Sequence, residues 1–224
     1  MSITPASTSR LPDLAMLSQP TGPAAEAFRA LRANLKFAAG DRPPRVILLA
    51  DTGTGEERAS VVANLAVALA QAGDPTLLID ADLRQPRQHA IFGVPNVAGV
   101  ATFLRGEDDA LPLLATAVPG LSLLPAGPQP PNPAELLAGA RCATLLARAR
   151  EVATFVIIDA PPISAVADAL ALAAAVDGVL LIVRAGKTRR PAAQRVKEQL
   201  ERVGANLLGA VLTDAQVEGG ANTY

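Results

Sequence analysis

The chain has 224 residues, with 20 Lys and Arg against 21 Asp and Glu and a formal net charge of −1. This balance argues against a protein that binds nucleic acid through bulk positive charge. Half of the residues are hydrophobic and the mean hydropathy is +0.29, which excludes a largely disordered chain. A single cysteine, Cys142, excludes an intrachain disulfide, and a single histidine, His89, excludes a metal site built from His and Cys.

Residues 1–22 are rich in Pro, Ser and Thr and show no periodicity, so we expect a flexible tail or linker there. They lack the apolar core flanked by positive charge that a signal peptide needs. The longest apolar stretch, Ala165–Val183, is interrupted by Asp168, Asp177 and Gly178, which argues against a membrane-spanning helix. We therefore expect a cytoplasmic protein without a membrane span.

A helix is predicted over residues 23–39, where apolar residues recur at helical spacing. Short apolar runs then alternate with longer helical stretches. The predicted strands, apolar on both faces, are Val46–Ala50, Thr76–Asp80, Leu121–Pro125, Phe155–Asp159, Val179–Arg184 and Leu207–Thr213. The predicted helices between them are Ser60–Ala72, Pro133–Val152, Ala165–Val176 and Arg190–Val203. This alternation predicts an α/β fold, an open and mostly parallel sheet with helices on both faces.

Carboxylates follow two of the predicted strands at the point where ligands of such sheets bind. Asp80 and Asp159 each end a strand, and Asp82 lies two residues beyond the first of them. A carboxylate is costly to bury there unless it meets a cation or a hydrogen-bond donor. One such Asp is readily a helix cap, but the three together favour a metal–phosphate site.

The segment 51–58, Asp-Thr-Gly-Thr-Gly-Glu-Glu-Arg, connects the first predicted strand to the next helix. Strand–loop–helix units of this kind bind phosphates through backbone N–H groups at the helix N-terminus. The loop nevertheless lacks the Gly-Lys-Ser/Thr of a P-loop and the third glycine of a dinucleotide-binding loop. Its own residues identify it only as a glycine-containing loop.

Five segments, in order along residues 24–214, read EAFRALRANLKF, TLLIDADLRQPRQHAIFG, LSLLPAGPQPPNPAELL, FVIIDAPP and VDGVLLIVRAGKTRR. Together they resemble the bacterial tyrosine kinases, the cytoplasmic P-loop domains that accompany capsule and exopolysaccharide chain-length regulators. The resemblance implies a P-loop NTPase-like domain of the MinD/ParA type over residues 23–214 and a flexible tail over 215–224. It also implies ATP and Mg²⁺ as cofactors, a homo-oligomer, and a membrane polysaccharide co-polymerase or chain-length regulator that brings the chain to the membrane.

By this resemblance, the nucleotide-binding positions are Gly53, Gly55, Glu56, Glu57, Arg58, Ala59, Ser60 and Thr213. Gly55 and Glu56 match the family's phosphate loop. The signature lysine is replaced by Arg58, the glycine before it by Glu57, and the magnesium-binding serine by Ala59.

Each replacement weakens the implied nucleotide site. Glu57 brings a side chain and a negative charge to a place where backbone approaches a polyanion; like charges 4 Å apart repel by about 1 kcal/mol in water and about 4 kcal/mol at an effective dielectric of 20. Arg58 is longer and planar where a lysine fits. Ala59 removes a metal-binding oxygen, which Ser60 replaces only if the helix start shifts. Thr213 stands where relatives usually carry an asparagine that reads adenine. We expect impaired ATP binding, and weak binding through backbone N–H groups stays an alternative.

The acidic side of the implied site is retained. Asp80 and Asp82 match the positions that the family uses to bind magnesium and to activate the acceptor hydroxyl, and Asp159 matches the second metal-linked Asp, so the predicted metal ligands are Asp80 and Asp159. Without a cation these carboxylates repel one another. We hypothesise that Arg58 is an internal counter-ion, paired with Asp80, Asp159 or Glu57.

Two further features bear on assembly and phosphorylation. Glu26, Arg29 and Arg32 match the ExxRxxR motif with which relatives pack a helix against the neighbouring subunit; the alternative is a solvated face with intrahelical pairs. Tyr224, the only tyrosine of the chain, is the candidate phospho-acceptor, in a tail that is tyrosine-rich in relatives.

Three functions remain open at this point. The first is a pseudokinase with impaired ATP binding that acts through protein contacts on a polysaccharide chain-length regulator. The second is an active tyrosine autokinase, in which Asp80 and Asp82 perform metal and base chemistry. The third is a MinD/ParA-type ATPase, against which the PPNPAELL segment and the Glu26–Arg32 helix argue.

Overall fold

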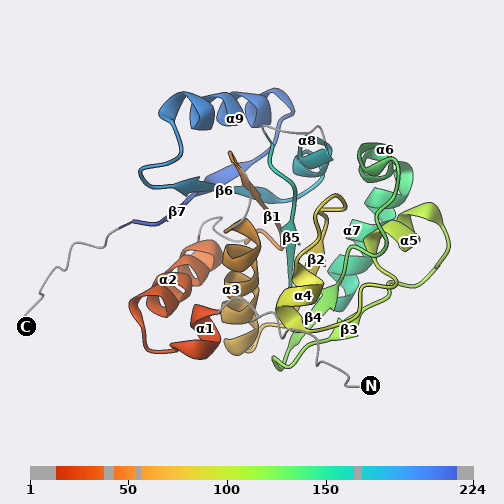
Figure 1. Ribbon diagram of the computed structural model, residues 1–224, viewed down its shortest axis with the longest axis horizontal. Coiled ribbons are helices and arrows are strands. Elements are labelled where there is room, and N and C mark those ends of the chain that lie inside the picture. The colour runs from red at the N-terminus through yellow and green to blue at the C-terminus, as the bar shows by residue number, and fades with distance from the viewer. Residues whose placement is uncertain (1–13, 38–42, 54–56, 164–167, 216–224) are drawn as a thin grey trace, which may run out of the picture.

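The computed structural model describes residues 14–37, 43–53, 57–163 and 168–215 (Figure 1). Within them, seven strands form one sheet in the order β3-β4-β2-β5-β1-β6-β7, and every neighbouring pair is parallel except β3 and β4. The strands are β1 (Val46–Asp51), β2 (Thr76–Asp80), β3 (Leu114–Ala115), β4 (Leu121–Leu124), β5 (Phe155–Asp159), β6 (Gly178–Arg184) and β7 (Leu207–Thr213). The predicted fold class, an open and mostly parallel sheet in an α/β protein, is confirmed.

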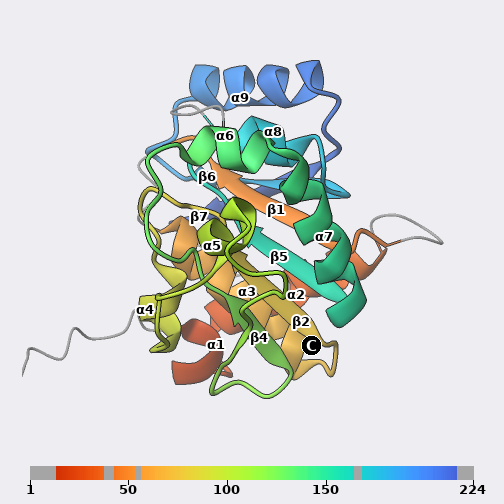
Figure 2. The same cartoon turned by 90° about the vertical axis from the view of Figure 1, so that its right-hand side faces the viewer.

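Helices cover both faces of this sheet. One face carries α1 (Ala15–Ser18), α2 (Pro23–Phe37), α3 (Arg58–Gln71) and α4 (Gln88–Phe92). The other carries α5 (Val100–Arg105), α6 (Pro133–Ala138), α7 (Ala140–Val152), α8 (Asp168–Ala173) and α9 (Arg190–Arg202), part of which faces the viewer in Figure 2. No helix within the described ranges has both the length and the apolarity to cross a bilayer.

The central strands are buried on both sides, as their apolar sequences predict. Every residue of β1, β2 and β5 is buried. Alternate residues of β1 face opposite cores: Leu48 packs with the α5–α9 layer, and Ile47 and Leu49 pack with the α1–α4 layer. Because both faces are covered, the strands need apolar side chains throughout rather than alternating ones.

The predicted strand boundaries agree with the structure to within one residue, but two predictions about helices and tails are wrong. The single helix predicted over Pro133–Val152 is two helices, because Gly139 adopts an extended conformation (φ −73°, ψ 160°) between them. A Cβ at this position would lie 3.2 Å from the carbonyl oxygen of Leu136, and glycine has a low helix propensity.

The flexible tail predicted over residues 1–22 is wrong for the part that the structure describes. Met16, on α1, is 1% exposed, and Leu14 is buried beside it. The backbone N–H of Met16 donates to Oδ1 of Asn64 on α3 at 3.0 Å. Two buried apolar side chains and this hydrogen bond attach the segment to the sheet-covering layer, a long-range contact that a Pro/Ser/Thr-rich composition does not reveal.

The structure also contains elements that the sequence did not predict: α4, α5 and the antiparallel edge strand β3. Helix α5 begins where Gly99 passes close to the loop after β4; a Cβ on Gly99 would lie 1.9 Å from the carbonyl oxygen of Pro125. The first N–H groups of α5 donate to Pro125 and Ala126 carbonyls, both at 2.8 Å. This close approach positions the loop that follows β4.

At the amino end of the sheet, Asp177 connects the start of β1 to α7. Its carboxylate accepts hydrogen bonds from the backbone N–H groups of Arg45 and Val46 and forms an ion pair with Arg150 at 2.6 Å. The Arg150 hydrogen bond is the main cause that lowers the pKa of Asp177 to about 2. This contact lies at the edge of the sheet opposite to the carboxyl ends of the parallel strands.

Candidate functional site

The carboxyl ends of the central strands gather four aspartates. Asp51 ends β1, and Asp80 and Asp159 end β2 and β5 as direct neighbours in the strand register. Asp82 follows in the loop after β2. Their exposures are 7%, 0%, 1% and 4% in the order named, so the sheet holds four carboxyl groups almost completely away from solvent, where each needs a partner.

Arg58, the first residue of α3, supplies the positive charge for this group. Its Nε donates to Asp159 Oδ1 and its Nη2 to Asp82 Oδ2, both at 2.6 Å, and its Nη1 lies 3.8 Å from Asp51 Oδ1. Arg58 is itself 3% exposed. Burial alone would lower the pKa of this guanidinium, but the carboxylates, Asp159 above all, raise it above its usual value. Arg58 is therefore a buried, permanently charged counter-ion.

The hypothesis that Arg58 is an internal counter-ion is thus confirmed, with Asp159 as the partner among the three predicted alternatives. The other two alternatives, Asp80 and Glu57, do not pair with Arg58. Asp80 is already engaged, because its Oδ2 accepts the backbone N–H groups of Arg87 and Gln88 at 3.0 and 2.9 Å. Glu57 pairs elsewhere. Burial, and then the charge of Asp159, raise the pKa of Asp80 well above its ordinary value. The backbone N–H groups of Arg87 and Gln88, rather than Arg58, hold Asp80 in place.

Gln88 is a member of this site that sequence reasoning missed. Its Nε2 donates to Asp159 Oδ2 at 2.7 Å and to the carbonyl oxygen of Ala59 at 3.0 Å, and the residue is fully buried. It therefore holds Asp159 in place from α4 and ties it to the start of α3. Nothing in a single sequence marks one glutamine in the DADLRQPRQ segment as buried, although the segment itself was recognised.

Three of the five buried side-chain atoms that lack a hydrogen-bond partner in the described residues belong to this site. They are Arg58 Nη1, Asp51 Oδ1 and Gln88 Oε1. Burial is the main cause that raises the pKa of Asp51 to about 6, and the charge of Arg58 opposes it. The site therefore combines strong ion pairs with incompletely satisfied groups beside them.

The residues present do not fit a magnesium ion. Mg²⁺ needs oxygen ligands in near-octahedral geometry, but both oxygens of Asp159 are engaged, by Arg58 and Gln88, and Asp80 accepts backbone N–H groups. Among the described residues, no group of three or more His, Cys, Asp or Glu side chains is arranged to hold a metal. The position of a cation among these carboxylates is taken by a guanidinium.

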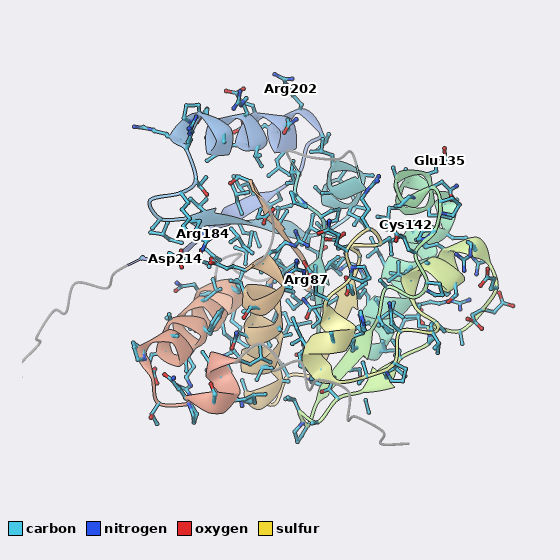
Figure 3. The ribbon with its side chains drawn as sticks, viewed as in Figure 1. Arg87, Glu135, Cys142, Arg184, Arg202 and Asp214 are labelled. Carbon is cyan, nitrogen blue, oxygen red and sulfur yellow. The ribbon has the colours of Figure 1, made fainter. Side chains whose placement is uncertain are left out.

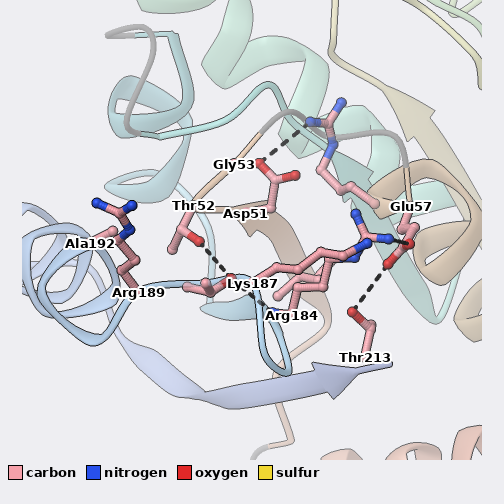
Figure 4. Close-up of a pocket in the computed structure, with 12 residues that line it drawn as sticks. Asp51, Thr52, Gly53, Glu57, Arg184, Lys187, Arg189, Ala192 and Thr213 are labelled. Carbon is pink, nitrogen blue, oxygen red and sulfur yellow. Dashed lines mark hydrogen bonds and ion pairs between the residues drawn. The ribbon is translucent and has the colours of Figure 1, made fainter. Parts of the chain in front are cut away.

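Next to this cluster lies a cavity of about 340 Å³. Its lining residues are Asp51, Thr52, Gly53, Glu57, Arg58, Ile182, Arg184, Lys187, Thr188, Arg189, Ala192 and Thr213. Three of the predicted nucleotide-binding positions, Gly53, Glu57 and Thr213, thus share one cavity with Arg58 (Figure 4). Gly55 and Glu56 lie outside the described residues.

Glu57 connects two other residues that line this cavity. Its carboxylate forms an ion pair with Arg184, at the end of β6, and accepts a hydrogen bond from Thr213 Oγ1 at 3.4 Å (Figure 4). Arg184 in turn donates to Asp214 at 2.8 Å (Figure 3). The carboxylate of Glu57 therefore lies on the cation and hydroxyl that line the cavity, where an anionic ligand would compete with it.

Two further predicted nucleotide-binding positions, Ala59 and Ser60, lie in the first turn of α3. Ala59 is 1% exposed and packs in the core beneath the sheet-covering helices. The carbonyl oxygen of Ser60 accepts a hydrogen bond from Asn64 Nδ2 at 2.9 Å, within a regular α3 that begins at Arg58. Ser60 is therefore the third residue of α3, and its role in metal binding stays a prediction.

On α2, the three residues of the ExxRxxR motif make contacts within the chain. Arg29 forms an ion pair with Glu26, and Arg32 Nη1 donates to the carbonyl oxygen of Ala68 on α3 at 3.0 Å. Glu26 is 64% exposed in its side chain. The candidate phospho-acceptor, Tyr224, lies outside the described residues.

Cys142 is buried on α7, where burial raises the pKa of its thiol to about 11, so it takes no part in this site (Figure 3).

Comparisons with known proteins show which proteins the chain is similar to. The chain is 33% identical to the putative tyrosine-protein kinase CapB of Staphylococcus aureus over 92% of its length and 91% of that protein. It is 38% identical to the tyrosine-protein kinase YwqD of Bacillus subtilis over 88% and 83% of the two chains. No family model matches the chain.

Solved structures give the same result for the fold. The chimerical protein CapA2B2 superimposes with a TM-score of 0.84 at 36% identity, covering 89% of this chain and 88% of that one. The cell division ATPase MinD of Pyrococcus furiosus has a TM-score of 0.65 at 23% identity, covering 75% of this chain and 71% of that one. The second match shows the fold alone, a P-loop NTPase-like sheet of the MinD type.

Proposed function

The chain belongs to the bacterial tyrosine-kinase family, and on that premise we propose that it is a pseudokinase: a cytoplasmic member with impaired ATP binding that acts through protein contacts. Its partner is a membrane polysaccharide co-polymerase or chain-length regulator, which holds the chain at the membrane. One observation carries the proposal. Arg58 lies among Asp51, Asp82 and Asp159, where catalysis would need a magnesium ion.

Magnesium cannot enter this position unless Arg58 leaves it. Arg58 and its two close partners, Asp82 and Asp159, are each less than 5% exposed, and breaking a buried ion pair costs about 3–5 kcal/mol. That is equivalent to a loss of more than a hundredfold in an association constant. Since metal and nucleotide bind phosphoryl-transfer enzymes together, the same cost falls on ATP.

The phosphate side of the site is opposed by Glu57. Its carboxylate already neutralises Arg184 and reaches Thr213, so a nucleotide must displace one anion and approach another. The chain thus supplies its own cation to the metal position and its own anion to the nucleotide cavity. A folded site of this kind needs no ligand, which suits a protein that works as a binding subunit.

An active tyrosine autokinase remains the second candidate, because the relatives are named as tyrosine kinases and Asp80, Asp82 and Asp159 are all retained. In that case the chain uses ATP and Mg²⁺ and phosphorylates Tyr224. Asp80 is a poor base for this chemistry, since it is fully buried and both of its oxygens accept backbone N–H groups. A MinD/ParA-type ATPase is the third candidate, supported by fold likeness only.

Titration calorimetry with ATP and Mg²⁺ and an anti-phosphotyrosine blot of the purified chain separate these functions. We expect no binding tighter than about 10 µM, which corresponds to about −7 kcal/mol, and no phosphotyrosine. Tighter binding with a phosphotyrosine signal that disappears in Tyr224→Phe would establish the autokinase. ATP hydrolysis without phosphotyrosine would instead establish the ATPase.

A matched pair of variants tests the cause. The triple change Glu57→Gly, Arg58→Lys and Ala59→Ser removes the internal anion and restores the family's residues, so we expect it to bind ATP and Mg²⁺ more tightly than the natural chain. Arg58→Lys alone keeps Glu57 and Ala59 and is expected to leave ATP binding undetected. If neither variant bound ATP and Mg²⁺, these three residues would not be the reason for the impairment.

A further inference from the structure

The positive charge of the chain is concentrated in one segment. Residues 184–197 contain no Asp or Glu and six basic residues: Arg184, Lys187, Arg189, Arg190, Arg195 and Lys197. Taking these six from the 20 Lys and Arg leaves 14 basic residues against 21 acidic ones in the rest of the chain, a net charge of −7. The near-neutral total therefore conceals an uneven distribution of charge along the sequence.

The structure places this segment on the outside of the molecule. It runs from the end of β6 through a short loop into the first two turns of α9, which forms the outermost layer on its side of the sheet (Figure 1). Arg189 is the N-cap residue of α9 and makes no side-chain cap hydrogen bond. The partial positive charge of the N-terminus of this 13-residue helix adds to that of the side chains around it.

Three of these six side chains have no ion pair within the described residues, while Lys197 pairs with Glu201 one helical turn further on. Arg189, Arg190 and Arg195 are exposed, and none has an ion pair with another described residue. Lys187 is 60% exposed and lies 3.8 Å from Asp214. Arg184, by contrast, is held by Glu57 and Asp214. We call Lys187, Arg189, Arg190 and Arg195 the basic face.

The kind of partner follows from what the basic face lacks. The centres of protein interfaces combine Arg with Trp, Tyr, Phe and Met. The basic face offers only the arginines, because none of the large apolar residues exposed in the described chain lies within residues 184–197. A layer of lipid headgroups needs no such anchor, because its attraction for Lys and Arg adds up charge by charge without a matching shape. The rest of the chain carries a net charge of −7, which such a layer repels, so orientations that turn the basic face toward the layer are favoured.

We propose that the basic face binds the anionic headgroups of a membrane surface and orients the chain on it. The contact is weak, reversible and screened by salt, and it adds to whatever protein partner holds the chain at the membrane. The proposal does not require ATP binding or its absence, so it stands or falls separately from the pseudokinase assignment.

Co-sedimentation of the whole chain with lipid vesicles tests this. We expect the chain to bind vesicles that contain phosphatidylglycerol and not vesicles of phosphatidylcholine alone, and the binding to fall steeply as the salt concentration rises. Each Lys or Arg near an anionic surface contributes about a fivefold change in partition. The triple variant Arg189→Gln, Arg190→Gln, Arg195→Gln is therefore expected to lose about a hundredfold.

The control variant is Arg84→Gln, Arg87→Gln, Arg105→Gln, which removes the same charge from exposed arginines outside α9. It is expected to bind as the natural chain does, and circular dichroism confirms that both triple variants are folded. Equal binding to the two kinds of vesicle, no binding at low salt, or an equal loss in the control variant would overturn the proposal. Tighter binding to a nucleic-acid oligonucleotide than to phosphatidylglycerol vesicles would also overturn it, because the face would then recognise a different polyanion.

Discussion

Two clusters of Arg and Asp lie at opposite edges of the same sheet. They differ in the balance between positive and negative charge and in how many buried atoms have a partner. At the amino edge, Asp177 meets Arg150 and two backbone N–H groups, and no buried side-chain atom of this pair lacks a hydrogen-bond partner. At the carboxyl edge, one guanidinium faces the carboxylates of Asp51, Asp82 and Asp159, with unpartnered buried atoms beside it. A balanced cluster is typical of a structural contact. A surplus of buried carboxylates is typical of a cation site, here filled by the protein itself.

We expect the largest effect from a substitution that breaks the ion pairs at the carboxyl edge. Arg58→Met keeps the approximate length of the side chain but leaves Asp82 and Asp159 buried and unpaired, so we expect a loss of about 3–5 kcal/mol in the free energy of unfolding. Urea denaturation measures it. The control is Arg184→Met, which removes the partly exposed ion pairs with Glu57 and Asp214 and is expected to cost much less, because solvent screens them. Equal losses in the two variants would contradict the buried counter-ion.

The second prediction concerns the pH dependence of the carboxyl edge. The pKa of Asp51 is raised from 3.8 to about 6, so between pH 4 and pH 6 the folded state keeps a proton that the unfolded state has lost. Stability therefore falls as the pH rises through this window. Asp51→Asn removes this penalty. Its free energy of unfolding, relative to that of the natural chain, is expected to be about 2 kcal/mol more favourable at pH 8 than at pH 4. A difference between the two proteins that stays constant with pH would show that Asp51 is not the cause.

The third prediction gives the opposite sign at the amino edge. The pKa of Asp177 is lowered from 3.8 to about 2, so its contribution is fully present above about pH 4 and is lost as the pH falls through about 2. Asp177→Asn is expected to cost about 1–2 kcal/mol at pH 7 and much less near pH 2. Asp109→Asn, at a side chain that is 98% exposed, is the control and is expected to show no such dependence. Thermal unfolding across the pH range is the measurement.

The smallest expected effect is at the rim of the cavity. Glu57→Gln removes the charge that faces Arg184, and because both side chains are about one-third exposed, we expect a loss of at most about 1 kcal/mol in stability. Urea denaturation at low and high salt measures it, with the difference decreasing as salt rises. A loss as large as that of Arg58→Met would mean that Glu57 is a structural residue rather than an occupant of the cavity.

The sheet was predictable because its strands are apolar runs that end in turn or charged residues, so Thr76–Asp80 and Phe155–Asp159 were placed correctly. The pairing of Arg58 was predictable only in part. The charge balance required a counter-ion, but the choice of Asp82 over Asp80 depends on the backbone N–H groups of Arg87 and Gln88, which occupy Asp80. Such local competition is decided by the folded loop and leaves no pattern in the sequence.

The same limit applies to the amino edge and to α1. Asp177 and Arg45 are 132 positions apart, and Met16 reaches Asn64 across 48 positions. Neither pair belongs to a periodic or turn pattern, so both had to come from the structure. The family resemblance located the site but assigned its residues the roles of a metal-binding kinase, which the contacts of Arg58 do not fit.

A crystal structure determined in the presence of ATP and Mg²⁺ tests the central claim most directly. The account predicts that Arg58 still pairs with Asp82 and Asp159 and that no metal ion lies between these carboxylates. An ordered triphosphate at the turn before α3, with magnesium bound by Asp80 or Asp159 and Arg58 turned away, would contradict it.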